Sequence, residues 1–255
     1  MRAHARQTEH ADAVLLRSVD YAEADRVVTL LTSRHGKVSL MARGARRSKK
    51  RFGGALEPFS LLDVELSIGG SDVGTLHAAS VTRAFPVLLR DLARMSAAGA
   101  ALELVREVLP DRSPDPAIFA STVSMFDALE RGVVPAEPLL LAFAAHVMGL
   151  SGFAPRLSAC GLCGKRPARG QAAEFDPARG FLVCRSCGGA ARRLSGAMRE
   201  LLVSALEEHW LPSEASASAS VASKDELDEA ERALAAFIEH RIERPFGQGL
   251  RLLRR

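Results

Sequence analysis

The sequence predicts an α+β protein in which a small five-stranded β-barrel is followed by a helical domain with an inserted four-cysteine module. Between residues 12 and 85, short β-rich segments are separated by turn residues, as is typical of consecutive strands. From Pro86 onwards, apolar residues recur at helical spacing. All four cysteines fall between residues 156 and 193, where they interrupt the helical pattern.

The N-terminal strands are predicted from alternation and turn signals. In the segment 62–68, Asp63, Glu65 and Ser67 alternate with apolar residues, which indicates a strand with one wet and one dry face. Turns are expected at residues 33–36 and 69–72, both of which contain glycine. Five strands in about 75 residues favour a closed barrel, because closure removes exposed strand edges. We expect a flexible tail over residues 1–11 and the barrel over residues 12–85.

The helical domain is expected in two parts, residues 86–155 and 194–255. In the first part, Asp115 and Pro116 are predicted to begin a helix as its N-cap and first residue. The segment AEPLLLAFAAHVMGLSGF, residues 136–153, is apolar nearly all round, which predicts a helix buried on most faces. His146 and His240 are interpreted as helix-packing residues. In the second part, the Ser/Ala-rich stretch 213–223 has little to bury and predicts a mobile loop.

Charge is distributed in blocks along the 255 residues, although the net charge is only +4. Residues 1–90 carry +5, residues 91–149 carry −4, residues 150–200 carry +6 and residues 201–255 carry −3. Two basic blocks therefore alternate with two acidic ones, and the basic blocks favour anionic partners. The sequence contains neither an apolar run of about 18–20 residues nor a secretory signal. We therefore expect a cytoplasmic protein without a membrane partner, in which disulfides do not form.

The cysteines follow the pattern C-x2-C-x20-C-x2-C, and they are Cys160, Cys163, Cys184 and Cys187. Two such pairs supply the tetrahedral thiolate set that Zn²⁺ prefers, so one structural zinc ion is predicted. Four cysteines close the coordination shell, which argues against catalytic zinc, and a redox pair would stand alone. Glycines at 161, 164, 188 and 189 suit tight turns at each pair. Whether the arginines of this module contact DNA is left open.

The stretch MARGARRSKKRFGGALEP, residues 41–58, holds the densest run of positive charge. Because it falls between the third and fourth predicted strands, it forms a barrel loop, and such loops bind nucleic acid in small barrels of the oligonucleotide-binding kind. The predicted DNA-binding residues are Lys37, Arg43, Arg46, Arg47, Lys49, Lys50 and Arg51. Phe52 is a candidate for stacking on bases, whereas Phe59 is expected in the barrel core.

Residues 21–66 resemble the N-terminal signature of the RecO family of bacterial recombination mediators. The likeness is carried by Tyr21, Glu23, Asp25, Thr32, Gly36, Lys37, the run Arg-Gly-Ala-Arg-Arg-Ser-Lys at 43–49, Phe52-Gly53-Gly54 and Pro58-Phe59. The order of strands, helices, cysteine segment and helices extends it over nearly the whole chain. The C-terminal end departs from the family pattern near residues 247–252. The sequence reveals no role for Tyr21, Glu23 and Asp25 other than shaping the connection between the first two strands.

The resemblance implies an OB-fold barrel, a helical domain and a zinc element. It also implies binding of single- and double-stranded DNA and annealing of complementary strands. The implied partners are RecR and the single-stranded-DNA-binding protein SSB, with which the protein helps RecA load onto SSB-coated single strands. Participation of RecF is left open. The implied location is the nucleoid within the cytoplasm.

Other functions are weighed against this one. A protein-interaction adaptor would bind RecR or SSB with negligible affinity for bare DNA. An RNA-binding or transcription-associated zinc-ribbon protein would prefer RNA. An enzyme is not expected, because the sequence lacks a Ser-His-Asp set, a phosphate-cradling G-x-x-x-x-G-K motif and paired carboxylates.

Overall fold

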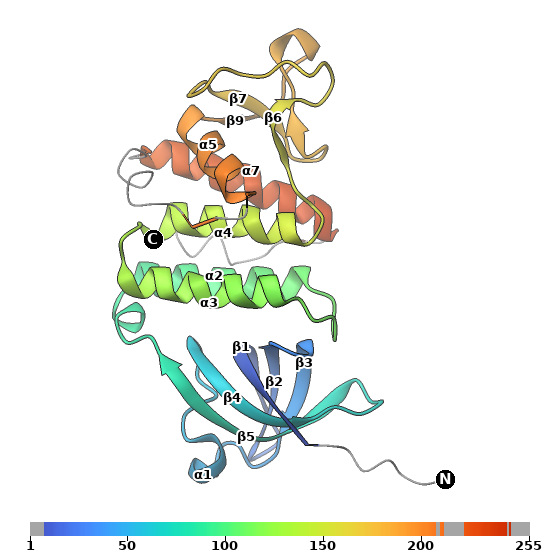
Figure 1. Cartoon of the computed structure of the whole chain (residues 1–255), viewed down its shortest axis with the longest axis vertical. Coiled ribbons are helices and arrows are strands. Elements are labelled where there is room, and N and C mark those ends of the chain that lie inside the picture. The colour runs from blue at the N-terminus through green and yellow to red at the C-terminus, as the bar shows by residue number, and fades with distance from the viewer. Residues whose placement is uncertain (1–7, 208–209, 212–221, 244, 246–255) are drawn as a thin grey trace. The chain divides into compact units, whose positions relative to one another are not determined.

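The computed structural model describes residues 8–207, 210–211, 222–243 and 245. The chain divides into two compact units (Figure 1). The first consists of the chain up to Leu89 together with Leu109–Phe126. The second consists of Arg90–Val108 and the chain from Asp127 onwards.

The first unit contains a closed barrel with the strand order β1-β2-β3-β5-β4, which confirms the predicted five-stranded barrel (Figure 1). Neighbouring strands are antiparallel except for β3 and β5, which are parallel. Its elements are β1 (Glu9–Tyr21), β2 (Asp25–Thr32), β3 (Gly36–Ala42), α1 (Lys49–Phe52), β4 (Ser60–Ser67) and β5 (Val73–Ala84).

The barrel core follows from the alternation of each strand. In β4, Leu62, Val64 and Leu66 point inwards and are fully buried, as their spacing predicts. Strand β1 begins at Glu9, three residues before the expected start of the barrel, and Ala11 lies in the core. It begins early because residues from Glu9 to Val14 pair with β4. Residues 1–7 of the expected tail lie outside the described part of the chain.

The segment Leu109–Phe126 belongs to the barrel unit, although it was expected in the helical domain. Helix α3 (Pro116–Arg131) begins in it, and the Asp115 carboxylate accepts the N–H of Ile118 at 3.0 Å, which confirms the predicted cap. The ring of Phe126 packs edge-on against Phe59 and Phe85, with centroids 6.1 and 5.4 Å away. These buried rings explain why the segment groups with the barrel.

The second unit is built around the buried helix α4 (Ala136–Leu150). All ten residues from Leu139 to Met148 are buried, so the prediction from their apolar character is confirmed. Helix α4 packs against α2 (Leu92–Val108), α5 (Gly196–Ala205) and α7 (Lys224–Ile242). His146 shares a hydrogen bond with the Ala205 carbonyl at 3.1 Å and stacks on Trp210, as its packing role predicts. His240 is exposed near the end of α7, so the same expectation for it is wrong. Among the described helices, none combines the length and apolarity that crossing a membrane requires.

The cysteine segment folds into a four-stranded sheet in the order β6-β8-β7-β9. Its elements are β6 (Arg156–Cys160), β7 (Ala173–Asp176), β8 (Phe181–Leu182), the 3-10 turn η2 (Arg185–Cys187) and β9 (Arg192–Leu194). The side chain of Arg199 on α5, only 6% exposed, donates to the carbonyls of Leu157, Ala168 and Gln171. The buried guanidinium therefore ties the sheet to α5. Most of the predicted mobile loop 213–223 lies outside the described residues.

Candidate nucleic-acid interface and metal centre

The basic run forms a loop, residues 43–51, between β3 and β4; this segment is called the basic loop below. It ends in helix α1, whose residue Phe52 is 2% exposed and belongs to the barrel core with Ala55 and Leu56. The hydroxyl of Ser48 caps α1 by accepting the backbone N–H of Arg51 at 3.4 Å. The basic loop is therefore anchored on the barrel by apolar packing.

The basic loop is bound by the turn between β1 and β2, residues 22–24, and by Asp25 at the start of β2. The Asp25 carboxylate accepts the N–H of Gly44 at 2.7 Å. The Ala24 carbonyl accepts the N–H of Arg46 at 3.0 Å, and the Glu23 carbonyl accepts its guanidinium at 3.3 Å. Hydrogen bonds to a charged carboxylate are about twice as strong as neutral ones. Asp25 and Glu23 thus position the basic loop, a role that the sequence did not reveal.

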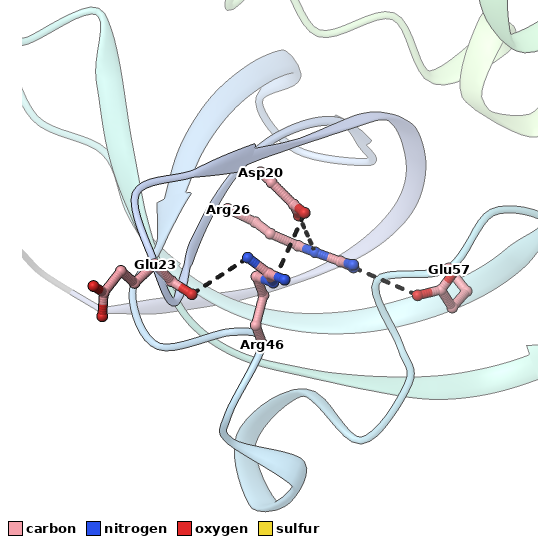
Figure 2. A network of polar contacts seen from close by, with 5 residues as sticks. All are labelled: Asp20, Glu23, Arg26, Arg46 and Glu57. Carbon is pink, nitrogen blue, oxygen red and sulfur yellow. Dashed lines mark hydrogen bonds and ion pairs between the residues drawn. The ribbon is translucent and has the colours of Figure 1, made fainter.

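A network of ion pairs surrounds Arg46 and Arg26 (Figure 2). The Asp20 carboxylate on β1 lies 3.0 Å from Nε of Arg26 and 3.8 Å from Nε of Arg46. Arg26, on β2, also reaches Glu57 at 3.4 Å. The repulsion within the basic run is therefore relieved partly by carboxylates from other segments. A phosphate that binds here competes with these carboxylates.

The remaining cations of the basic loop differ in what they contact. Arg51 is turned back on the loop, because it donates to the Arg43 carbonyl at 2.7 Å and lies 5.1 Å from the centroid of Phe52. Arg47 pairs with the exposed carboxylate of Glu23 at 3.3 Å. Three exposed side chains make no ion pair with any described residue, and they are Arg43, Lys49 and Lys50.

Lys37 lies at the opposite end of β3 from the basic loop, about 20 Å away along the strand. Its side chain is 14% exposed and pairs with Asp111 at 3.2 Å. The structure thus brings the predicted residues from Arg43 to Arg51 together and leaves Lys37 apart from them.

Two residues near the basic loop differ from the sequence-based expectation, namely Arg26 and Phe52. Arg26 is an isolated cation in β2, and its place beside Arg46 and Asp20 makes it part of the candidate interface. Phe52 is buried, so the expectation that it stacks on bases is wrong; Phe59, 7% exposed, lies in the core as expected. The sequence pointed to this surface only through Tyr21, Glu23 and Asp25, which match the family signature.

The four cysteines converge on one point. Their sulfur atoms all lie within 4.8 Å of one another, and Cys163 Sγ is 3.6 Å from Cys184 Sγ. Sulfurs at the corners of a tetrahedron around Zn²⁺ are separated by about 3.8 Å, since each Zn–S bond is about 2.3 Å. The donor set therefore fits a tetrahedral thiolate-bound metal.

The protonation of these thiols also suits a cation. Backbone N–H groups, first that of Cys184 and then those of Cys163 and Leu162, lower the pKa of Cys160 to about 6. The Ser186 hydroxyl is the main cause that lowers the pKa of Cys184. Hydrogen bonds with Cys163 and Cys184 raise the pKa of Cys187 to about 12. The Cys160 and Cys184 thiols thus lose their protons more readily than an isolated cysteine, as metal ligation requires.

The glycines of the module act in two ways. Gly164, Gly188 and Gly189 have positive φ, as expected for the tight turns. Gly161 does not, and instead a side chain there would collide with the ring of Phe181. The Glu174 carboxylate accepts the Ala190 N–H at 3.0 Å and holds the turn after Cys187 in place.

Three of the module's arginines are paired within the chain. Arg179 contacts Asp176, Arg185 contacts Glu174 and Arg192 contacts Glu229. The remaining predicted cations of the module are Arg166, Arg169 and Arg193. The basic loop thus presents the denser group of unpaired charge.

Comparisons with known proteins agree over nearly the whole chain. Residues 6–85 match the family model "Recombination protein O N terminal", and residues 89–249 match "Recombination protein O C terminal". The chain is 43% identical over 236 residues to a DNA repair protein RecO from Anaeromyxobacter sp. strain K, which covers 91% of this chain and 90% of the relative. It is 42% identical over 184 residues to the protein of the same name from Myxococcus xanthus, covering 71% of this chain and 73% of the relative. A third, from Geobacter sulfurreducens, is 39% identical over 193 residues, covering 75% and 77%.

Proposed function

The chain belongs to the RecO family of DNA repair proteins, and from this membership we propose that it is a DNA-binding recombination mediator. In this proposal it binds single- and double-stranded DNA and anneals complementary strands. Together with RecR, it helps RecA load onto SSB-coated single strands at the nucleoid. It acts by binding and not by catalysis.

The observation that carries the proposal is the basic loop. Its outward cations Arg43, Lys49 and Lys50 are exposed and lack carboxylate partners among the described residues, and Arg47 has only an exposed one. Phosphates of DNA supply the missing negative charge. Each contact releases a counterion, so four of them on a single strand give a slope of log affinity against log salt of about −2.8. Affinity then falls about 50-fold between 50 and 200 mM salt.

Annealing follows from the same electrostatics. Two complementary strands repel each other through their phosphates, and cations held on one surface lower that repulsion. Because the basic loop is fixed by Phe52 and by the β1–β2 turn, its charges are held in place before DNA binds. Such preorganisation lowers the entropy lost on binding.

The direct test compares a double charge reversal in the basic loop with a matched control. Lys49→Glu with Lys50→Glu removes two phosphate contacts, so the salt slope for a single-stranded oligonucleotide is expected to flatten by about 1.4. Arg34→Glu with Lys224→Glu changes the net charge equally at exposed positions outside the loop, and is expected to retain the slope. Fluorescence anisotropy between 50 and 200 mM salt measures both.

The outcomes separate the candidate functions. Equal losses in the two variants would show that net charge, and not the basic loop, attracts DNA. Tight binding to SSB or RecR without affinity for bare DNA would favour an adaptor. Strong competition by RNA over DNA would favour an RNA-binding protein.

We further propose that the cysteine cluster holds one zinc ion through Cys160, Cys163, Cys184 and Cys187. A closed shell of four thiolates supplies folding energy and no open position for catalysis. When bound, the ion cross-links β6 to η2, in a segment whose strands are two to five residues long. Elemental analysis of the purified protein is expected to give one zinc per chain, and substitution of Cys184 by serine to abolish it.

A further inference from the structure

Among the described barrel residues up to Leu89, one aromatic ring is exposed. These residues include four aromatic side chains, of which Phe52, Phe59 and Phe85 are 2%, 7% and 1% exposed. The fourth, Tyr21, is 56% exposed and is the only tyrosine of the chain. Single-stranded DNA is usually bound by cations along its backbone together with aromatic rings on which bases stack. Among the aromatic residues of the strands and their connections, the ring available for such stacking is therefore Tyr21.

Tyr21 is held next to the basic loop. It is the last residue of β1 and lies directly opposite Asp25 on β2, so the two Cβ atoms are about 5 Å apart on the same face of the sheet. Asp25 in turn accepts the N–H of Gly44 in the basic loop at 2.7 Å. Asp20 and Glu23, close to Tyr21 in the sequence, both contact Arg46 (Figure 2). Through Asp25, the strand end that carries Tyr21 is thus tied to the loop whose cations the proposed function assigns to DNA phosphates.

The surroundings of Tyr21 suit a base. Val19 lies two residues before it on the same face of β1, and is 43% exposed. Across the strand pair, Val19 faces Val27, which is partly exposed. A short apolar strip therefore continues from the ring along the outside of the barrel. It offers contact area to an unstacked base and none to phosphate.

Tyr21 has no structural role in the fold that accounts for its position. Among the described residues, its ring contacts no other ring and its hydroxyl makes no hydrogen bond. Large aromatic side chains on soluble proteins usually bury most of their surface. An exposed ring at the end of a β-hairpin whose turn binds a basic loop is the arrangement expected of a stacking platform.

We propose that Tyr21 is the residue on which a base of single-stranded DNA stacks while the basic loop contacts the flanking phosphates. The inference rests on the proposed function and extends it to strand preference. Bases in a duplex are already stacked on one another and cannot lie on the ring. Tyr21 thus favours single strands, whereas the cations serve both forms of DNA.

The test measures single- and double-stranded affinities of the full chain with four proteins at one salt concentration. Tyr21→Ala is expected to weaken binding to a fluorescent single strand by about 5- to 150-fold, the range for loss of one stacked base. Its affinity for the duplex and its salt slope are expected to be unchanged. Tyr21→Phe keeps the ring and is expected to bind like the wild type. Phe153→Ala removes an exposed ring of the helical unit as a matched control and is expected to have no effect.

Each other outcome is decisive. If the wild type binds the single strand and Tyr21→Ala binds it equally well, the inference is overturned while the proposed function stands. Equal losses for single strand and duplex would show that Tyr21 acts by positioning the loop, and failure of Tyr21→Phe would assign the contact to the hydroxyl. A wild type that binds no DNA would overturn the proposed function along with the inference. As a direct readout, the emission added by Tyr21→Trp is expected to be quenched by the oligonucleotide, measured over the Trp210 background.

Discussion

Replacing Asp20 by asparagine tests whether its carboxylate competes with DNA phosphate for Arg26 and Arg46. The Asp20 carboxylate contacts Arg26 at 3.0 Å and Arg46 at 3.8 Å. Asparagine keeps the shape of the side chain and removes its charge. The two guanidinium groups then lose their shared counterion, which leaves Arg26 with Glu57 alone and Arg46 with no carboxylate partner among the described residues, so both contact phosphate more readily. We therefore expect the substitution to lower stability and to raise DNA affinity.

The size of both effects follows from the exposure of the network. The Asp20 side chain is 54% exposed, and exposed ion pairs contribute about 0.2–1 kcal/mol each. Losing two such pairs is expected to lower the free energy of unfolding by about 0.5–1.5 kcal/mol. If both arginines then meet phosphates, the salt slope for a single strand steepens by about 1.4. Affinity at low salt rises by about 3- to 10-fold, because DNA no longer displaces the carboxylate.

Salt-titrated anisotropy measures the affinity, and urea unfolding measures the stability. Asp72→Asn is the matched control, since it removes the same charge from an exposed position in the turn between β4 and β5. It is expected to change the affinity by less than the interface variant and to leave the slope alone. Weaker DNA binding by the Asp20 variant with intact stability would refute the competition between carboxylate and phosphate.

Three further predictions concern the fold. Gly36→Ala is expected to lower the free energy of unfolding by about 2 kcal/mol or more in urea unfolding, because φ is +65° and the new methyl group would collide with the Ser113 carbonyl; an unchanged midpoint would contradict this. Arg199→Met is expected to cost about 2–4 kcal/mol, since it leaves buried carbonyls unpaired, and Arg199→Lys is expected not to restore them fully in the same assay. Burial lowers the pKa of His146 below its ordinary value of about 6.5, so the unfolded state binds the proton more tightly. The stability that His146 contributes is thus present above pH 6.5 and is lost as pH falls below it. Unfolding followed by Trp210 fluorescence is expected to show this fall in the free energy of unfolding, and His146→Gln is expected to make it shallower.

The sequence was informative where one local pattern determines the structure. Alternation around Leu62 and Val64 indicated the barrel, Asp115 marked the start of α3, and the spacing of the cysteines indicated their cluster. In each case the deciding residues are close in the sequence, or their chemistry admits few alternatives.

The sequence was uninformative where the contacts are distant. Asp25 and Gly44 are separated by 19 positions, and nothing in either segment shows that they meet. Phe52 follows six cations and was therefore expected in a solvent-exposed loop, whereas in the structure it packs into the barrel core. In the sequence, Phe126 is an ordinary apolar residue of a helix, and its contact with the distant Phe59 is visible only in the structure.

The return of the chain to the barrel unit after α2 has a practical consequence for dissecting the protein. A fragment that stops after β5 loses Phe126, which packs on the rings of Phe59 and Phe85. Such a fragment is expected to expose an apolar patch and to aggregate. A self-contained barrel fragment must instead keep residues up to Phe126, with Arg90–Val108 excised and replaced by a flexible linker. Protease nicks near residue 90 alone therefore do not release an intact barrel.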